Sequence, residues 1–592
     1  MAILRFKIRN HLLAILAGFT FLHLAQNGLA QVSANSYVPC QEMPDLMQQF
    51  KADKSAIVRF YSPSENAPRY QLSGGIGSPD KLGRLIKLNN TYLERLADLD
   101  FAALPQECKV DYILFKRDLQ DELRTWQGQA KAMDTLKNWF PFADSLFAFE
   151  RLRRRGLDIA APQVAAYFDG VAKQVPLLIQ KLKPLPLGPE QIRLSSEVLG
   201  LLRKTAKSVF DFYNGYDPLF SWWVPEAYHR ADSLMRTYEK AFKEKQQPNS
   251  MGMYVRTPVG RDELMRLLKL EMINYSPEEL LAIAQKEMNW CQQELLKASQ
   301  ELGYGNNWKA ALEKVKQSAV PPGKQPEAIR KLYEESVSFI KEHDLITIPP
   351  LAEETWGMIM MSPQRQKSNA FFTGGWEISI TYPTNTMDYD LRQMRMLGNN
   401  PYFSRATVHH ELIAGHNLEF FMNARHRTYR EFDTPFWMEG WALYWEMLLW
   451  DKGFARTPEE KIGMLFWRKY RCARIIFQLN FHLGNWSPEQ CADFLVNEVG
   501  HERANVESEL NWPLSRDSQA FPLYQVSYYT GGLEFYALHR EVVGAGKMTE
   551  KAFHDAIMKL NAMPVEMIRA ILTGQTLTED FKTQWRFYDL KE

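Results

Sequence analysis

The spacing of hydrophobic residues along most of the chain is typical of amphipathic helices. Apolar residues recur at three-and-four spacing after Pro277 and again after Pro458. Three helix starts are marked by a serine or threonine, a proline, and an acid or amide three residues after the hydroxyl, the pattern of an N-terminal cap. These starts are Ser276-Pro277-Glu278-Glu279, Thr457-Pro458-Glu459-Glu460 and Ser487-Pro488-Glu489-Gln490. We therefore predict a mainly α-helical fold.

Between residues 345 and 383 the helical pattern gives way to short runs that are typical of strands. They are residues 346–348, 358–361 and 376–382, and the last alternates apolar and polar side chains. A proline-rich segment at 320–326 predicts a turn or a short linker. We expect a small sheet, and a boundary near residue 325 between a helical N-terminal region, 31–325, and a catalytic region, 326–592. The two regions are expected to pack as one two-lobed body.

Residues 1–30 have the features of a secretory signal peptide. Three basic residues precede an apolar run at 12–22, and small residues at 28–30 form a cleavage site. The alternative, a transmembrane anchor, needs about 18–20 apolar residues, and polar side chains interrupt this run earlier. No other segment of that length is apolar. We expect an exported protein, periplasmic or secreted, with no stable membrane insertion after the signal is removed.

Composition and charge narrow the classes of function. The chain has 592 residues, of which 45% are hydrophobic, and its 71 basic side chains nearly balance 70 acidic ones. This composition is typical of a globular protein. A nucleic-acid partner is not expected, because binding through counterion release needs a basic face. The sequence contains no signal that predicts an oligomeric state.

Five cysteines are too few for a disulfide scaffold in a chain of this length, and none forms a C-x-x-C pair. In an oxidising compartment a single bridge has two open pairings, Cys472 with Cys491 or Cys40 with Cys108. The odd count leaves at least one free thiol.

The candidate chemistry lies in the segment Val-His-His-Glu-Leu-Ile-Ala-Gly-His at 408–416. A His-Glu pair followed by a second histidine is typical of zinc metallopeptidases, in which two imidazoles bind the metal and the glutamate accepts a proton from water. The alternative is an amphipathic helix that happens to contain histidines.

The spacing of these histidines differs from the usual one. His410 and His416 are six residues apart, which on an unbroken helix means about 240° of rotation and 9 Å of rise. A local unwinding, which Gly415 permits, would bring them together. His409 and His416 share a face but are about 10.5 Å apart along the axis. We predict His410 and His416 as ligands and His409 as a packing or supporting residue.

A third ligand is expected in the apolar, aromatic helix at 436–446, which carries Glu439 and Glu446 seven residues apart. A glutamate in so apolar a run is unfavourable unless it is paired or bound to a metal. The alternative is two exposed glutamates. We assign the metal to Glu439, which follows His416 by 23 residues. Glu446, two turns further along, is expected to orient an imidazole from behind.

Taken in order, these and later motifs resemble the bacterial family called domain of unknown function 885, a zincin-like group similar in fold to mostly helical gluzincin peptidases. The resemblance covers most of the chain after residue 30. It is carried by His410-Glu411 with Gly415-His416, Glu439-Gly440-Trp441-Ala442-Leu443-Tyr444 with Glu446, Arg474, His482, Trp486-Ser487, Gln525-Val526-Ser527-Tyr528-Tyr529-Thr530-Gly531, Phe553-His554-Asp555-Ala556, Met563-Pro564, and Asp111-Tyr112 with Leu119. It implies a large helical zincin-like body, a small β-sheet beside the active-site helix, and a central substrate cleft.

The resemblance also implies roles. Zn²⁺ would be held by His410, His416 and Glu439, with Glu411 as general base and Tyr528 stabilising the oxyanion. Tyr529 would take the place of Tyr528 if the match were shifted by one residue. The sequence departs from the family pattern at three positions, where the family usually has proline, histidine and an acid. These positions are Ala414, Asn417 and Gln478.

We therefore expect a zinc metallopeptidase that hydrolyses short peptides. The alternatives are an inactive relative that binds peptides or cell-wall fragments, and a zinc hydrolase acting on a non-peptide amide. Arg474 and His482 are candidates to bind a substrate carboxylate or the oxyanion, and a structural ion pair is the alternative for Arg474. The strand at 376–382 is expected to hold an extended peptide through main-chain hydrogen bonds.

Overall fold

The computed structural model describes residues 41–61, 76–366, 369–518 and 520–590. Helices dominate these residues, and their only sheet has two strands. The predicted mainly α fold is confirmed. Among the described residues, no helix combines the length and the apolar character needed to cross a membrane. The predicted signal peptide, residues 1–30, lies outside them.

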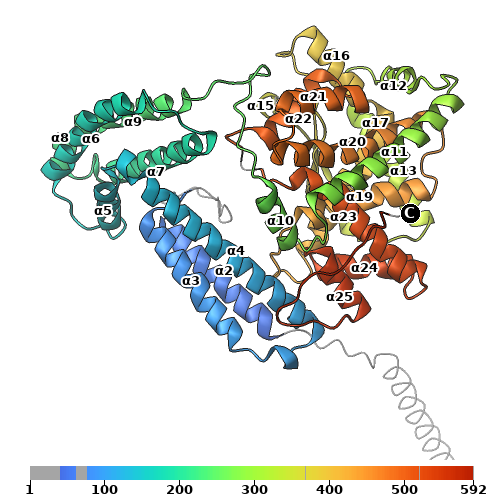
Figure 1. Ribbon diagram of the computed structural model, residues 1–592, viewed down its shortest axis with the longest axis horizontal. Coiled ribbons are helices and arrows are strands. Elements are labelled where there is room, and N and C mark those ends of the chain that lie inside the picture. Colours follow the sequence, from blue (N-terminus) through green and yellow to red (C-terminus); the bar gives the residue numbers. More distant parts are fainter. Residues whose placement is uncertain (1–40, 62–75, 367–368, 519, 591–592) are drawn as a thin grey trace, which may run out of the picture.

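Three long helices at the N-terminal end run alongside one another (Figure 1). They are α2 (Glu42–Tyr61), α3 (Pro79–Ala97) and α4 (Gln106–Leu136). Helix α4 joins the two lobes of the molecule. Tyr112 and Leu114 near its start are buried in the core of the larger body, whereas Leu136 at its end is buried in the core of a smaller lobe.

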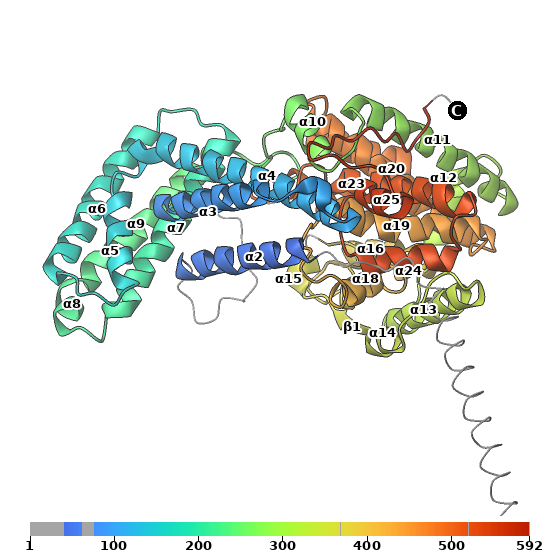
Figure 2. The ribbon, with the colours of Figure 1, turned by 90° about the horizontal axis from the view of Figure 1, so that it is seen from below.

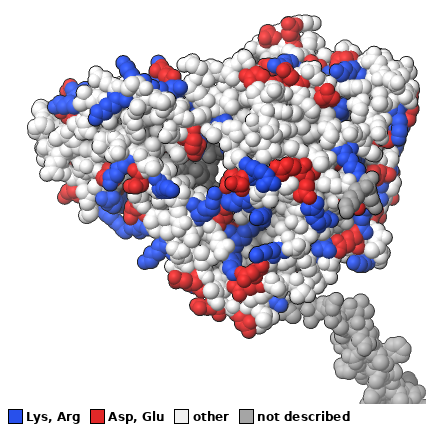
Figure 3. Space-filling model, in the orientation of Figure 1, with Lys and Arg blue, Asp and Glu red and all other residues white. Residues whose placement is uncertain are grey.

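The smaller lobe is a helical bundle that extends to one side of the body, as Figures 1 and 2 show. Its helices are α5 (Ala143–Arg153), α6 (Ala161–Leu182), α7 (Pro189–Tyr213), α8 (Pro218–Trp223) and α9 (Pro225–Lys243). Their apolar faces form a hydrophobic core separate from that of the body. The surface is hollowed between the lobe and the body (Figure 3).

The body contains the remaining helices, and all of them except α15 and α16 contribute to one hydrophobic core with the first part of α4. They are α10 (Arg261–Leu270), α11 (Pro277–Glu301), α12 (Trp308–Lys316), α13 (Gln325–Glu342), α14 (Pro350–Thr355), α15 (Pro363–Gln366), α16 (Tyr389–Gly398), α17 (Pro401–Glu411), α18 (His416–Asn423), α19 (Pro435–Asp451), α20 (Pro458–His482), α21 (Pro488–Phe494), α22 (Arg503–Leu514), α23 (Tyr524–His539), α24 (Glu550–Leu560) and α25 (Val565–Thr573). Helices α19 and α23 pack closely, as do α11 and α20. The boundary proposed near residue 325 falls between α12 and α13, whose residues Leu312 and Ile329 are buried in this same core.

The three predicted helix starts are confirmed. Ser276, Thr457 and Ser487 each accept a hydrogen bond from the backbone N–H three residues on, and the side chain of that residue accepts one from the backbone N–H of the cap residue. These caps begin α11, α20 and α21. Helix α20 runs through the centre of the body and is buried along most of its length.

The small sheet consists of β1 (Gly357–Met360) and β2 (Glu377–Ile380), which are parallel. The other edge of β2 is also occupied. The N–H of Ser379 donates to the carbonyl of Thr373 at 2.8 Å, and the N–H of Thr373 donates to the carbonyl of Ser379 at 3.2 Å. Ser379 therefore has no free backbone group on this edge for the extended peptide that was expected to bind along 376–382.

The strand predicted at 346–348 is absent. The backbone N–H and the hydroxyl of Thr347 both bond to the carboxylate of Asp555, so this backbone is held by a side chain and not by a neighbouring strand. Helix α14 begins shortly afterwards at Pro350.

The structure excludes one of the two predicted pairings of cysteines. Cys291, Cys472 and Cys491 are free and buried, so the pairing of Cys472 with Cys491 is wrong. Cys108 is disulfide-bonded. Cys40 lies outside the described residues.

Candidate metal centre

A break between α17 and α18 brings the two predicted histidine ligands together. Helix α17 ends at Glu411, and α18 begins at His416. In the loop between them, the N–H of Gly415 donates to the carbonyl of His409 at 3.0 Å. A Cβ at position 415 would lie 2.7 Å from that oxygen, so the approach requires glycine. The local unwinding predicted at Gly415 is present.

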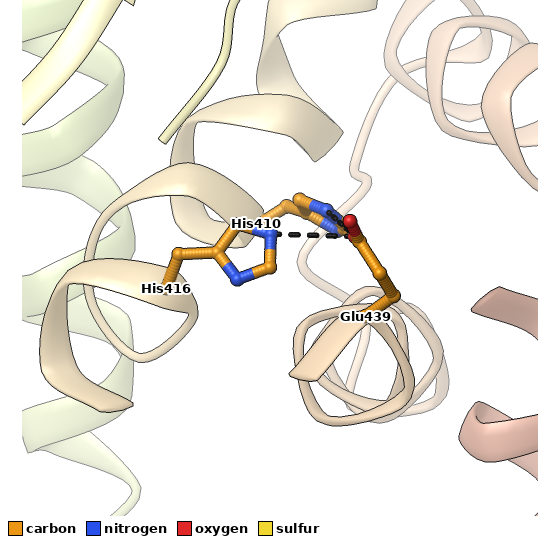
Figure 4. A group of neighbouring side chains, drawn as sticks. All are labelled: His410, His416 and Glu439. Carbon is orange, nitrogen blue, oxygen red and sulfur yellow. Dashed lines mark ion pairs between the residues drawn. The ribbon is translucent and has the colours of Figure 1, made fainter. Parts of the chain in front are cut away.

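Helix α19 supplies the third side chain. His410, His416 and Glu439 are all buried, and one ligand atom of each lies within 4.8 Å of the others. The Nε2 atoms of both histidines are 3.4 Å from the same oxygen, Oε2 of Glu439. Figure 4 shows the imidazoles facing this carboxylate from two different helical segments. The structure thus brings together the three residues predicted as ligands.

Two of the separations in this cluster suit a small tetrahedral ion. A separation of 3.4 Å is longer than a normal N–H···O hydrogen bond, and Oε2 of Glu439 has no hydrogen-bond donor. Two ligand atoms bound tetrahedrally at about 2.0–2.1 Å from zinc are about 3.3 Å apart. Two imidazoles and one carboxylate are also a donor set of catalytic zinc sites, which keep a further position for water or substrate.

Each imidazole also contacts a second carboxylate through its other nitrogen. Nδ1 of His410 lies 2.8 Å from Oε1 of Glu446, and Nδ1 of His416 lies 3.4 Å from Oε1 of Glu419. Carboxylates in this position fix the orientation and the tautomer of a metal-binding histidine. Glu446 was predicted to orient an imidazole, and its position is compatible with that role. Glu419 was missed, although its position three residues after His416 on one helix face was a usable signal.

Four buried glutamates surround the two imidazoles, and their pKa values are shifted in different directions. Burial raises the pKa of Glu411, although the neighbouring histidines oppose this effect. Burial likewise raises the pKa of Glu419 to about 7. Burial also acts to raise the pKa of Glu439, but the two imidazoles outweigh it and keep this pKa well below 4.5. A divalent cation between the ligands would offset this concentration of negative charge.

The cluster lines a cavity of about 350 Å³. Glu411 and Tyr528 line it with the three candidate ligands, and so do the side chains of Trp467, Arg471, Arg474, Glu509, Trp512, Tyr524 and Gln525. Phe420 on α18 also lines a second and larger cavity of about 1200 Å³, beside α2 and α4. Among the residues that the structure describes, Phe420 is the one lining residue that the two cavities share.

Two tyrosines, one turn apart on α23, lie beside the cluster. The ring of Tyr528 is 6.2 Å from the ring of His410 and nearly parallel to it. The hydroxyl of Tyr524 donates to the carboxylate of Glu439. Burial and Glu439 raise the pKa of both phenols, so both stay protonated and can donate hydrogen bonds at neutral pH. Tyr524 was missed, and its spacing of four residues before Tyr528 was the available signal.

Two other predicted site residues lie elsewhere. His482 lies about 12 Å beyond Arg474 along α20. There its Nδ1 accepts a hydrogen bond of 3.4 Å from the N–H of Val259. Tyr529 points about 100° away from Tyr528 around α23. Its hydroxyl accepts a hydrogen bond of 3.1 Å from Nε of Arg468. Neither residue lines the cavity, so we assign no role there to His482 or Tyr529.

His409 is also directed away from the cavity. It is buried and packs edge-on against Phe454, with ring centroids 5.7 Å apart. Burial lowers its pKa to about 4, so the ring is neutral. This position agrees with the packing role predicted for it.

The three departures from the family pattern make structural hydrogen bonds. The carbonyl of Ala414 accepts a bond of 2.8 Å from the indole of Trp441. Asn417 donates to the carbonyl of Trp376 at 2.8 Å, and Gln478 donates to that of Pro522 at 2.9 Å. These contacts tie the loop, α18 and α20 to their neighbours.

Comparisons with known proteins give a family and a fold. The family model described as "Bacterial protein of unknown function (DUF885)" matches residues 75–572. No protein among the curated ones matches the chain. A solved candidate lipoprotein of unknown function from Shewanella oneidensis is 15% identical, with a TM-score of 0.62 over 90% of this chain and 100% of that one. A candidate lipoprotein from Colwellia psychrerythraea is 14% identical, with a TM-score of 0.54 over 90% and 98%.

Proposed function

Because the chain belongs to the DUF885 family of bacterial proteins of unknown function, whose name specifies no activity, we propose from the site itself that it is a zinc-dependent metallopeptidase acting on short peptides. One observation carries this proposal. The Nε2 atoms of His410 and His416 both lie 3.4 Å from Oε2 of Glu439, and this oxygen has no hydrogen-bond donor. The relationship to gluzincin peptidases is part of the same proposal. The pattern of residues 1–30 supports an exported location, periplasmic or secreted, as does the description of the two solved relatives as candidate lipoproteins.

In this proposal His410, His416 and Glu439 hold the metal. When bound, zinc would lower the pKa of a coordinated water and polarise the carbonyl of the scissile bond. Glu446 and Glu419 orient the two imidazoles through their Nδ1 atoms, as the distances of 2.8 and 3.4 Å allow.

Glu411 is the base in the proposed reaction. It adjoins the ligand His410 in sequence and lines the cavity, and its buried carboxylate can accept a proton from the attacking water. The same carboxyl can then return that proton to the leaving amine. Tyr528 lines the cavity as a protonated phenol and can donate a hydrogen bond to the oxyanion that develops on the carbonyl. Tyr524 orients Glu439 through its hydroxyl.

Digestion of a mixed peptide library tests the proposed activity. We expect new cleavage products, mapped by mass spectrometry, when the protein is loaded with zinc, and none after treatment with a chelator, because water must be activated by the metal. Adding zinc back should restore the same cuts. Zinc binding without any cleavage would favour an inactive peptide-binding relative, and cleavage of a non-peptide amide alone would favour an amidohydrolase.

Substitution of Gly374 tests whether the placement of Glu411 matters. An added Cβ at this position would lie 2.7 Å from the carbonyl oxygen of Glu411 and 2.9 Å from its Cα, so Glu411 must shift. A misplacement of about 1 Å at a reacting group can lower turnover about 10²-fold, and we expect Gly374→Ala to do so while zinc is retained. Gly200→Ala on α7, where the added Cβ meets nothing within 4 Å, is the control and should leave turnover unchanged. Equal activity of both variants would mean that the position of Glu411 does not limit the reaction.

A further inference from the structure

Two buried arginines line the cavity beside the candidate metal centre. Arg471 and Arg474 lie three residues apart on α20, and so share one face of that helix. They are only 3% and 6% exposed. The proposed hydrolysis assigns no role to either guanidinium.

The nitrogens of these arginines are incompletely paired. Nη2 of Arg474 donates to Glu509 at 2.9 Å, but its Nε and Nη1 have no partner. Nη2 of Arg471 donates to Glu446 at 3.2 Å, and its Nε has no partner. Buried donors are nearly always satisfied in folded proteins, and a guanidinium presents its donors as a fork that matches a carboxylate.

The ion pair with Glu509 does not by itself explain the position of Arg474. Glu509 also accepts a bond of 3.0 Å from the hydroxyl of Tyr470, so its carboxylate has a second donor within the protein. Arg474, in contrast, uses one nitrogen and leaves two others buried and unpaired, and its side chain lines a cavity that a ligand can enter. An anion in the cavity would complete its hydrogen bonds.

Tyr528 locates these arginines relative to the metal centre. Its ring is 6.2 Å from the ring of His410, and 4.5 Å and 4.7 Å from Cζ of Arg474 and Arg471. An extended residue spans at most about 3.6 Å. Cζ of Arg474 is therefore at most about 11 Å from the ring of His410, so a carboxylate bound there is separated from a scissile carbonyl at the metal by no more than about three extended residues.

We propose that Arg474, assisted by Arg471, binds the free C-terminal carboxylate of the substrate, and that the protein is a carboxy-terminal exopeptidase releasing no more than about three residues. This inference rests on the proposed peptidase function and specifies its substrate class. The cavity of about 350 Å³ suits the short released end, and the adjoining cavity of about 1200 Å³ beyond Phe420 can receive the remainder of the peptide.

Paired substrates test this assignment. A set of N-acetylated hexapeptides that vary in their last two residues is prepared both as free acids and as C-terminal amides. With the zinc-loaded full-length protein, we expect cuts no more than about three residues from the C-terminus of the acids. We expect kcat/KM to be about 10–100-fold lower for the matched amides, because a charged hydrogen-bonded contact is lost.

Variants test whether Arg474 is the residue that distinguishes the free acids from the amides. Arg474→Lys keeps the charge but removes the fork, and should reduce the preference for acid over amide. The pair Arg474→Gln with Glu509→Gln removes both charges and serves if the single variant does not fold. Arg395→Gln is the matched control, because Arg395 is equally buried and bonds Asn505 and Ser508 of α22, but lies outside the cavity. It should keep the wild-type preference.

Binding provides a readout that does not depend on turnover. The zinc-loaded Glu411→Gln variant is titrated by calorimetry with the acid and amide forms of the same hexapeptides, and the acids are expected to bind about 10–100-fold more tightly. Internal cuts with equal rates for acids and amides would overturn the exopeptidase assignment and leave the peptidase proposal standing. No cleavage of either form, together with no cleavage of the mixed peptide library, would overturn the peptidase proposal, and equal binding of both forms would overturn carboxylate capture independently.

Discussion

Replacement of Glu411 by glutamine is expected to lower turnover by about 10²–10⁴-fold without loss of zinc. The amide keeps the shape of the side chain but cannot accept a proton, and general acid–base catalysis contributes a factor of this size. Glu411 adjoins the ligand His410 and lines the cavity, yet it is not one of the three side chains that converge as ligands. Steady-state hydrolysis of a mapped peptide, with metal analysis of the same preparation, measures both quantities.

The zinc content separates the two roles that a glutamate beside a metal can have. If Glu411→Gln lost its zinc, Glu411 would be a ligand and the assignment of Glu439 would need revision. If the variant kept both zinc and full turnover, another group would be the base. Wild-type circular dichroism and melting temperature of the variant would show that the fold is intact.

Replacement of Glu439 by alanine should remove the metal, whereas replacement of Glu446 by alanine should leave it bound. Glu439→Ala removes the oxygen that both imidazoles face at 3.4 Å, and it should empty the site at micromolar zinc. Glu446→Ala removes a carboxylate that contacts the far nitrogen of His410 and accepts a bond from Arg471, and it should keep zinc with turnover reduced about 10–100-fold. A competition titration with a chromogenic chelator measures the affinities.

A buried glutamate away from the site provides the control for this pair. Glu534 on α23 is 1% exposed, and both its carboxylate oxygens lack a partner. Glu534→Gln should therefore keep wild-type zinc affinity. Loss of zinc from Glu446→Ala with retention by Glu439→Ala would exchange the roles of the two glutamates.

Local sequence signals predicted the helical framework well. The N-terminal caps at Ser276, Thr457 and Ser487 act over three residues, so their effect is contained in the sequence around them. The strand predicted at 346–348 failed because Thr347 bonds to Asp555, more than 200 residues away. No local pattern contains that contact.

The candidate site was predictable to the extent that its residues are close in the sequence. The spacing of His410 and His416 required a break in the helix, and Gly415 marked where it occurs. Glu419 and Tyr524 could have been found from helical spacing to His416 and Tyr528. The approach of Gly374 to Glu411 joins distant segments, and spacing does not encode it.

The role expected for 376–382 shows a second limit of local patterns. Alternating side chains correctly indicated a strand there, but they do not report which edges of the strand are free. The pairing of Ser379 with Thr373 and of β2 with β1 depends on the tertiary arrangement.

Titration of zinc into the metal-free protein, with hydrolysis of one mapped peptide followed at each step, tests the central claim most directly. The account predicts no hydrolysis before zinc is added and a rise that reaches its plateau at about one zinc per chain, because one cluster of two imidazoles and one carboxylate holds the ion. The Glu411→Gln protein should bind the same amount of zinc without the rise in activity. Hydrolysis that is unaffected by removal of the metal, or binding of one zinc with no hydrolysis of any peptide, would contradict it.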